Sequence, residues 1–151
     1  MSIKKLGSQT IRFENPPSII GTASIVGPKE GQGQFKDYYD LILSDNIYAE
    51  SSWEKAEKKI LKEAIEIAIK NADLTTPKID YLIAGDLLNQ IISAGFAARE
   101  LEIPFLGIYG ACSTLAEGVT LGSIIVDGGF AENLVAAVSS HFCTAERQFR
   151  F

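Results

Sequence analysis

The chain has 151 residues and a net charge of −5 at neutral pH, with 46% hydrophobic and 22% charged residues. This composition is typical of one globular domain with a hydrophobic core, and it argues against a disordered chain. The acidic balance, without a cluster of Lys and Arg, also excludes the common nucleic-acid binders and a purely electrostatic membrane anchor.

The N-terminus and the cysteine content point to the cytoplasm as the place of synthesis. The first five residues, Met-Ser-Ile-Lys-Lys, are not followed by the apolar core of a signal peptide. The uncharged stretch 103–116 is too short to span a bilayer and contains Pro and Gly. Two cysteines form no disulfide framework and fit a reducing compartment, and a single histidine argues against a dedicated zinc site.

The first third of the chain predicts short extended segments and a long loop. Two apolar runs, 10–13 and 18–26, are separated by Asn15-Pro16-Pro17, which prevents a helix, so we expect two short strands. Residues 27–49 contain Pro, several Gly and an aromatic cluster. A loop of that length in a compact domain is usually functional or packs at an interface.

The next segment predicts a helix from residue 51 to about residue 71. Ser51 and Glu54 have the spacing of a capping box. The Lys- and Glu-rich face of this helix is expected to face solvent. Three- and four-residue spacing predicts a buried stripe formed by Trp53, Ala56, Ile60, Ala64, Ile67 and Ala68.

Strands and helices then alternate to the end of the chain. We expect strands at 78–84, 103–109 and 133–139, and helices at about 89–101 and 112–126. Strands nearly free of charge that alternate with helices indicate a mostly parallel sheet with helices on both faces, an α/β/α arrangement. The helix at 112–126 is apolar almost all round, so we expect it to lie between two layers.

Candidate ligand-binding residues follow the three strands, because ligands of parallel sheets gather outside the carboxyl ends of the strands. Cys112 stands at a strand-to-helix turn, where helix amides and the helix dipole favour a thiolate. The same amides, together with Ser113, could hold a carboxylate. The alternative is that Cys112 is a small buried residue that lets the helix approach the strand.

The other candidates each have a structural alternative. Asp86 could orient a ligand or bind a cation, or it could cap the following helix. His141 could donate a hydrogen bond to an anion, or it could be a packed side chain. Cys143 is interpreted as structural. The charged segment 146–150 is either a clamp over a pocket or a solvated turn.

Several longer motifs resemble one known family, that of stage V sporulation protein AD, over nearly the whole chain. The motifs are FENPP at 13–17, GTA at 21–23, GPKE at 27–30, AGDLLNQ at 84–90, IPFL at 103–106, GACST at 110–114, DGGFA at 127–131, SSH at 139–141 and TAERQFR at 144–150.

The resemblance implies a thiolase-like fold and a role in moving dipicolinic acid (pyridine-2,6-dicarboxylic acid), with calcium, into the developing spore. It also implies membrane-embedded stage V sporulation partners and a place at the surface of the spore inner membrane. Cys112 matches the thiolase nucleophile. A thiolase-like fold has two similar halves, and residues 1–151 correspond to the first, so we expect an incomplete lobe, no catalysis and no cofactor.

Three functional hypotheses remain open. In the first, the chain binds dipicolinate: amides near Cys112 and Ser113 receive one carboxylate, His141 donates to the other, and Asp86 contacts calcium carried by the ligand. In the second, Cys112 is the nucleophile of an acyl-transfer enzyme of the condensing type. In the third, the chain is an assembly subunit that forms a homodimer through the strand at 133–139.

Overall fold

A computed structural model describes residues 4–88 and 91–149. Its centre is a parallel sheet of three strands in the order β6-β5-β7. The strands are β5 (Tyr81–Gly85), β6 (Phe105–Gly107) and β7 (Leu134–Val138). In the pairing register, Leu82 lies opposite Phe105 on one side and opposite Val135 on the other. The apolar run of β5 is buried on both faces, as expected for the middle strand of a parallel sheet.

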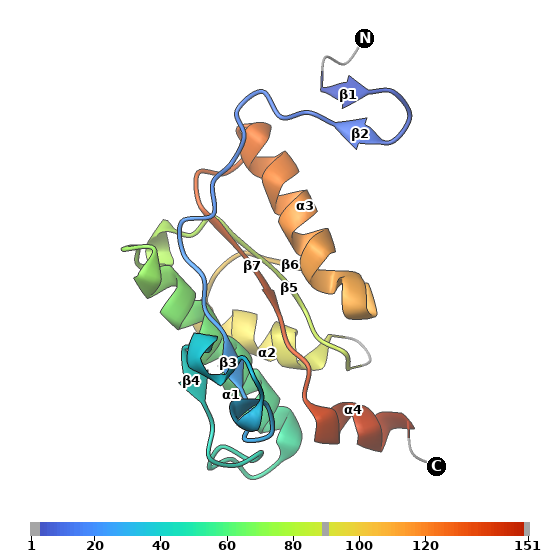
Figure 1. Ribbon diagram of the computed structural model, residues 1–151. Coiled ribbons are helices and arrows are strands. Elements are labelled where there is room, and N and C mark those ends of the chain that lie inside the picture. Colours follow the sequence, from blue (N-terminus) through green and yellow to red (C-terminus); the bar gives the residue numbers. More distant parts are fainter. Residues whose placement is uncertain (1–3, 89–90, 150–151) are drawn as a thin grey trace.

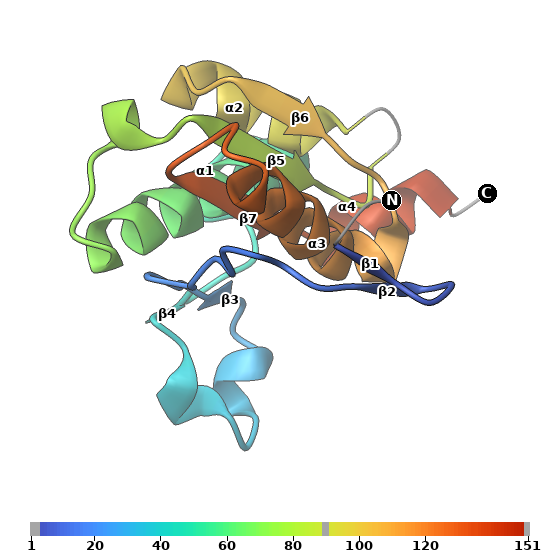
Figure 2. The same ribbon diagram turned by 90° about the horizontal axis from the view of Figure 1, so that it is seen from above.

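Helices cover both faces of the sheet (Figures 1 and 2). The helices α1 (Trp53–Asn71) and α2 (Ile92–Leu101) pack against each other and against one face. The helix α3 (Thr114–Asp127) packs on β5 and β7 from the other face. This arrangement confirms the predicted α/β/α order of layers.

The hydrophobic core lies between β5 and the pair α1 and α2. Alanines of α2 allow its backbone to approach α1 and the sheet closely, while α1 contributes Leu and Ile. The core residues are Leu61, Ile65, Ile69, Ile79, Leu82, Ala84, Ala94, Ala97, Ala98, Leu101 and Ile103. Burial of this apolar surface is the main stabilising contribution to the fold.

The structure corrects two predictions about α1. The cap is Ser52, whose hydroxyl accepts a hydrogen bond from the Lys55 N–H, while the Ser51 hydroxyl accepts from the Lys55 ammonium. The buried stripe is also rotated about the helix: Ala56 belongs to it, but Trp53 is 37% exposed and the other predicted members are only partly buried. The buried residues of α1 are Ala56, Glu57, Leu61, Ile65 and Ile69.

The expectation that the helix at 112–126 lies between two layers is wrong for the described residues. One side of α3 packs on the sheet through small residues such as Gly118 and Gly122, which approach Ala136 and Leu134. The opposite side is partly open to solvent. Its exposed apolar residues include Leu115, Val119, Leu121 and Ile124.

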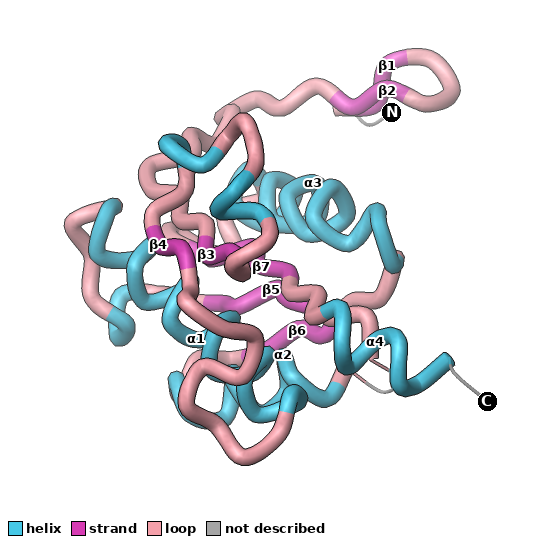
Figure 3. Tube along the Cα trace, turned by 60° about the horizontal axis from the view of Figure 1, so that its bottom comes forward, coloured by secondary structure: helices cyan, strands magenta, loops and turns pink. Residues whose placement is uncertain are grey.

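The N-terminal third forms small paired elements outside the main sheet (Figure 3). An antiparallel hairpin joins β1 (Lys5–Leu6) and β2 (Thr10–Ile11), and a parallel pair joins β3 (Ile25–Val26) and β4 (Leu41–Ile42). Both predicted strands therefore exist but are shorter than expected. The predicted long loop contains β4 and two short 3-10 turns, Glu30–Gln32 and Lys36–Tyr38.

Several element boundaries differ from the sequence prediction. A 3-10 turn, Thr76–Lys78, precedes β5, and a second one, Ala111–Ser113, precedes α3. The helix α2 begins at Ile92, and residues 89–90 of the predicted helix lie outside the described residues. A further helix, α4 (Phe142–Phe149), follows β7 where no helix was predicted. In the described part of the chain, none of the helices has both the length and the apolar character needed to cross a bilayer.

Asp127 ties the N-terminal segment to the end of α3. One carboxylate oxygen accepts hydrogen bonds from the N–H groups of Glu14 and Asn15, at 2.9 and 2.7 Å, and the other lies 2.7 Å from the Lys4 ammonium. The Lys4 contact, followed by the Asn15 amide, lowers the pKa of Asp127. The carboxylate therefore stays ionised above its lowered pKa, and the tether weakens only as the pH falls through it.

We expect Asp127→Ala to release the N-terminal segment without unfolding the sheet. Trypsin cleavage after Arg12 should become several-fold faster at neutral pH, because cleavage follows the population of the open segment. Mass spectrometry of a digestion time course measures this rate. The variant Asp37→Ala, which removes a carboxylate from an exposed 3-10 turn, should digest like the unmodified chain, and equal rates for both variants would contradict the tether.

Candidate functional site

The carboxyl ends of β5, β6 and β7 lie at one edge of the sheet because the three strands are parallel. Asp86 follows β5, the segment with Cys112 and Ser113 follows β6, and His141 follows β7. Neighbouring strands are roughly 5 Å apart, so the turns after β6 and β7 are separated by about 10 Å. The fold thus brings all four predicted site residues to the same edge.

The turn before α3 presents Cys112 to solvent. Ala111, which precedes it, has a positive φ of 49°. The Ser113 hydroxyl donates to the Gly110 carbonyl at 2.7 Å, and the buried Thr114 hydroxyl accepts from the Gly110 N–H and donates to the Ala111 carbonyl. These bonds hold the turn in shape with its thiol exposed. The alternative interpretation of Cys112 as a buried packing residue is therefore wrong.

Gly85 makes this turn possible. A Cβ at Gly85 would overlap the Ile108 carbonyl oxygen and lie 2.8 Å from the Thr114 methyl carbon. The end of β5 therefore touches both the segment that leads to Cys112 and the first residue of α3. Only glycine lets these backbones approach so closely at the candidate site.

Asp86 has the helix-capping role that was its structural alternative, although the N-cap residue of α2 is Ile91. Its side chain is 1% exposed. One oxygen accepts from the Leu88 N–H at 2.8 Å and the other from the Ala94 N–H at 2.7 Å. Burial raises the pKa of Asp86, while the amides of Ala94, Leu88 and Ser93 act in the opposite direction. The carboxylate thus fixes the start of α2, and a ligand role for it remains a prediction.

His141 is buried and held by main-chain atoms on both sides of its ring. Its Nε2 lies 2.7 Å from the Asn46 carbonyl oxygen, and its Nδ1 accepts from the Cys143 N–H at 3.2 Å. A carbonyl can only accept, so this geometry corresponds to the neutral tautomer with the proton on Nε2. A donor role of His141 toward an anion remains a prediction, and it would require the Nε2 proton to leave the Asn46 carbonyl.

A buried glutamate lies beside this edge, and it was not among the predicted site residues. Glu57 of α1 is 2% exposed, which makes it an exception to the predicted solvent-facing charged face, whose other Lys and Glu residues are exposed or partly exposed. Its two oxygens contact the hydroxyls of Ser139 at 2.8 Å and Thr144 at 2.6 Å. A sequence signal was present, because Glu57 stands four residues before Leu61 and eight before Ile65 on one helix face.

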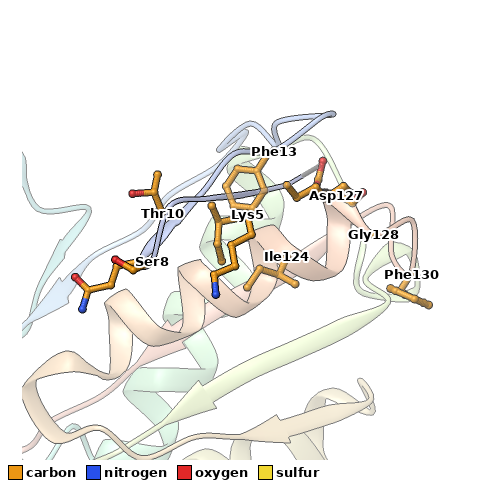
Figure 4. Close-up of a pocket in the computed structure, with 11 residues that line it drawn as sticks. Lys5, Ser8, Thr10, Phe13, Ile124, Asp127, Gly128 and Phe130 are labelled. Carbon is orange, nitrogen blue, oxygen red and sulfur yellow. Dashed lines mark hydrogen bonds and ion pairs between the residues drawn. The ribbon is translucent and has the colours of Figure 1, made fainter. Parts of the chain in front are cut away.

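Two cavities lie near these elements. The larger, about 520 Å³, lies between the N-terminal hairpin and the end of α3, where Lys5 and Phe13 reach toward Ile124 (Figure 4). It is at the opposite end of α3 from Cys112, about 20 Å along the helix axis. The smaller, about 260 Å³, is lined in part by Glu57, Ser139 and His141. Of the four predicted site residues, the smaller cavity is lined by His141 and not by Asp86, Cys112 or Ser113.

Two further predictions concern metals and the C-terminal segment. Within residues 4–88 and 91–149, no three His, Cys, Asp or Glu side chains are grouped as they would be around a metal ion. Cys143 is partly buried on α4. The segment at 146–149 continues the helix rather than forming a turn, and residue 150 of the proposed clamp lies outside the described residues.

Solved structures define the class of fold. The chain is similar to 3-oxoacyl-[acyl-carrier-protein] synthase III from Aquifex aeolicus VF5, with a TM-score of 0.54 and 19% identity over 59% of this chain and 31% of the synthase. It is also similar to the priming β-ketosynthase of a polyketide biosynthetic pathway, with a TM-score of 0.50 and 15% identity over 56% and 27% of the two chains. These identities show the fold alone, which is thiolase-like, as predicted.

The sequence comparisons define the family. The family model for stage V sporulation protein AD (SpoVAD) matches residues 7–151. The curated stage V sporulation protein AD of Bacillus subtilis strain 168 is 44% identical over 149 residues, which cover 99% of this chain and 44% of that protein. The chain therefore belongs to the stage V sporulation protein AD family, as its motifs predicted, and it spans less than half the length of this relative.

Proposed function

We propose that this chain binds dipicolinic acid, together with calcium, and takes part in its uptake into the developing spore. The observation that carries the proposal is the exposed turn at Cys112, which stands at the start of a 14-residue helix on the ligand-binding edge of a parallel sheet. Helix N-termini bind carboxylates through their free N–H groups and dipole. Membership of a sporulation protein family supports the same role.

The ligand chemistry fits a dicarboxylate that arrives with its cation. Dipicolinate carries two carboxylates at neutral pH, and one of them would be received at the Cys112–Ser113 turn, where the Ser113 N–H would exchange its present hydrogen bond to the Gly110 carbonyl for one to the carboxylate. A bare dianion would be repelled by an ionised Asp86. Calcium prefers six to eight oxygen ligands. The dipicolinate oxygens and waters would therefore supply most of its coordination, and Asp86 would contact the ion only at the edge of its coordination shell.

Calorimetric titration of the 151-residue chain with dipicolinate, with and without calcium, tests the proposal. We expect saturable heat at millimolar ligand or below, and tighter binding when calcium is present. In the variant Cys112→Asp a negative charge stands beside the amides, so the affinity should fall by about tenfold or more. The control Thr120→Asp adds the same charge to an exposed site further along α3 and should bind normally. Equal affinities of both variants, or no saturable heat, would refute the site.

Acyl transfer is a second candidate function because the Cys112 thiol is exposed. Cys112 is accessible, and a helix N-terminus favours its thiolate. The only histidine, His141, has both ring nitrogens on main-chain atoms, which does not favour its use as a base for Cys112. A stable acyl adduct on Cys112 after incubation with acyl-coenzyme A, found by mass spectrometry, would support the enzyme instead of the binding module.

The proposed setting of this function is the surface of the spore inner membrane, beside membrane-embedded stage V sporulation proteins. A homodimer is proposed as well, through the outer edge of β7, because one edge of this strand pairs with β5 and its residues are only partly buried. Unpaired strand edges favour such association. Light scattering of the purified chain tests the dimer, and a monomer at all concentrations would argue against it.

A further inference from the structure

The carboxyl group of Glu57 joins two parts of the chain that flank His141. Ser139, at the end of β7, donates its hydroxyl proton to one oxygen at 2.8 Å. Thr144, in the first turn of α4, has its hydroxyl 2.6 Å from the other oxygen. Both hydroxyl residues are buried, with exposed fractions of 7% and 2%. One carboxyl group on α1 thus holds the β7–α4 turn at both ends.

The hydrogen bonds of Thr144 show which form of Glu57 fits best. The single Thr144 hydroxyl proton has two acceptors within reach, a Glu57 oxygen at 2.6 Å and the His141 carbonyl at 2.8 Å. If Glu57 carries a proton, it donates to the Thr144 oxygen, and Thr144 donates to the His141 carbonyl. If Glu57 is ionised, Thr144 can serve only one of its two acceptors well. The protonated form satisfies every member of the cluster.

The surroundings of Glu57 favour the same form. Burial raises the pKa of Glu57, and the nearby charge of Asp86 acts in the same direction, whereas the hydroxyls of Thr144 and Ser139 and the His141 ring lower it. Among the side chains that the structure describes, the titratable groups that act on Glu57 are Asp86 from the β5–α2 turn and His141 from the β7–α4 turn. Neither of these two supplies a fixed positive charge against an ionised Glu57.

We propose that Glu57, Ser139 and Thr144 form a proton-dependent latch that regulates the candidate site. With its proton, Glu57 fixes the 139–141 turn and α4 against α1. When the proton is lost, the buried charge favours opening of the turn and of α4 toward water. His141 lies between the two anchored residues, so opening moves it away from the edge that carries Cys112. This effect on ligand binding rests on the proposed function, while the latch itself does not.

The direction of the pH dependence follows from linkage. In the open form Glu57 is hydrated and has an ordinary carboxyl pKa, whereas in the closed form its pKa is raised. The closed form therefore holds its proton over a range of pH in which the open form has lost it. Across that range the open population increases by up to about tenfold per pH unit as the pH rises, and below the ordinary pKa it is constant.

The reactivity of Cys143, which is partly buried in the closed form, should rise with the open population. In a Cys112→Ser background Cys143 is the sole thiol of the chain. The alkylation rate of Cys143 is measured from pH 5 to pH 9 in the protein with Glu57 and in the Glu57→Gln variant. The ratio of the first rate to the second removes the intrinsic pH dependence of the thiol. Gln mimics protonated Glu, because its amide donates to Thr144 and its oxygen accepts from Ser139. We expect the ratio to rise with pH by tenfold or more, and a flat ratio would overturn the latch.

Two hydroxyl variants provide a second, independent test. Thr144→Val removes the hydroxyl that faces Glu57 and should accelerate Cys143 alkylation at all pH values. Thr120→Val removes a hydroxyl that bonds only within exposed α3 and should leave the rate unchanged. Equal effects of the two would also overturn the latch, and circular dichroism shows whether either variant is unfolded.

A dipicolinate titration then separates the latch from the proposed function. With Glu57 present, the affinity should fall between pH 6 and pH 8 in proportion to the loss of the closed population, and Glu57→Gln should remove this fall. If alkylation follows the expected pattern but no dipicolinate binds at any pH, the proposed function fails and the latch remains. If dipicolinate binds with the same affinity at both pH values and the alkylation ratio is flat, the latch fails and the proposed function remains.

Discussion

Asp86→Ala should lower the free energy of unfolding by about 3–5 kcal/mol, enough to unfold much of a marginally stable domain. The Asp86 carboxylate is 1% exposed and accepts from backbone N–H groups of the loop before α2 and of its first turn. Alanine leaves these donors buried without an acceptor, at about 1–3 kcal/mol each, and removes the cap of α2. Urea denaturation followed by circular dichroism measures the loss.

The matched control for this variant is Asp45→Ala. The Asp45 carboxylate also accepts from two backbone amides, those of Ile47 and Tyr48, but it does so in an exposed loop. Water can replace it there, so the loss of stability should be much smaller than for Asp86. Similar losses for both variants would mean that the buried cap contributes little, and Asp86 would then be free to serve mainly as a ligand group.

The alternation of strands and helices could be predicted because each element has a local signal. Uncharged runs such as 103–109 and breaks such as Gly110 and Gly128-Gly129 place the strands and turns without knowledge of the tertiary structure. The rule that ligands gather at the carboxyl ends of parallel strands then selects the turns with Asp86, Cys112 and His141. The topology confirms that these turns share an edge.

The features that the sequence did not predict depend on contacts between distant segments. Glu57 is buried because Ser139 and Thr144, more than 80 residues later, supply hydroxyl groups to it. A charged residue on a Lys- and Glu-rich helix gives no local sign of such partners. The rotated stripe of α1 has the same origin, since the position of α2 and the sheet decides which side of α1 is buried. The exposed side of α3 depends on what else packs there, which periodicity alone does not specify.

Gly85→Ala should cost about 3 kcal/mol of stability and disturb the Cys112 turn at the same time. The added methyl group would overlap the Ile108 carbonyl oxygen and press on Thr114 in a fully buried place, where neither neighbour is the flexible end of a side chain. Backbone must therefore move, and the segment that moves leads directly to the turn of Cys112. The variant should show both a lower urea midpoint and a changed alkylation rate of Cys112.

The matched control Gly95→Ala distinguishes the effect of the close backbone approach at Gly85 from the general effect of replacing glycine with alanine. A Cβ at Gly95, in the middle of α2, has no neighbour within 4 Å. Alanine there should raise stability by about 0.5–1 kcal/mol, because it favours the helix. If Gly85→Ala were as harmless as Gly95→Ala, the strand end and the turn could not be in contact. The exposed position of Cys112 would then not depend on β5, and the anion site proposed at that turn would lose its rigid support.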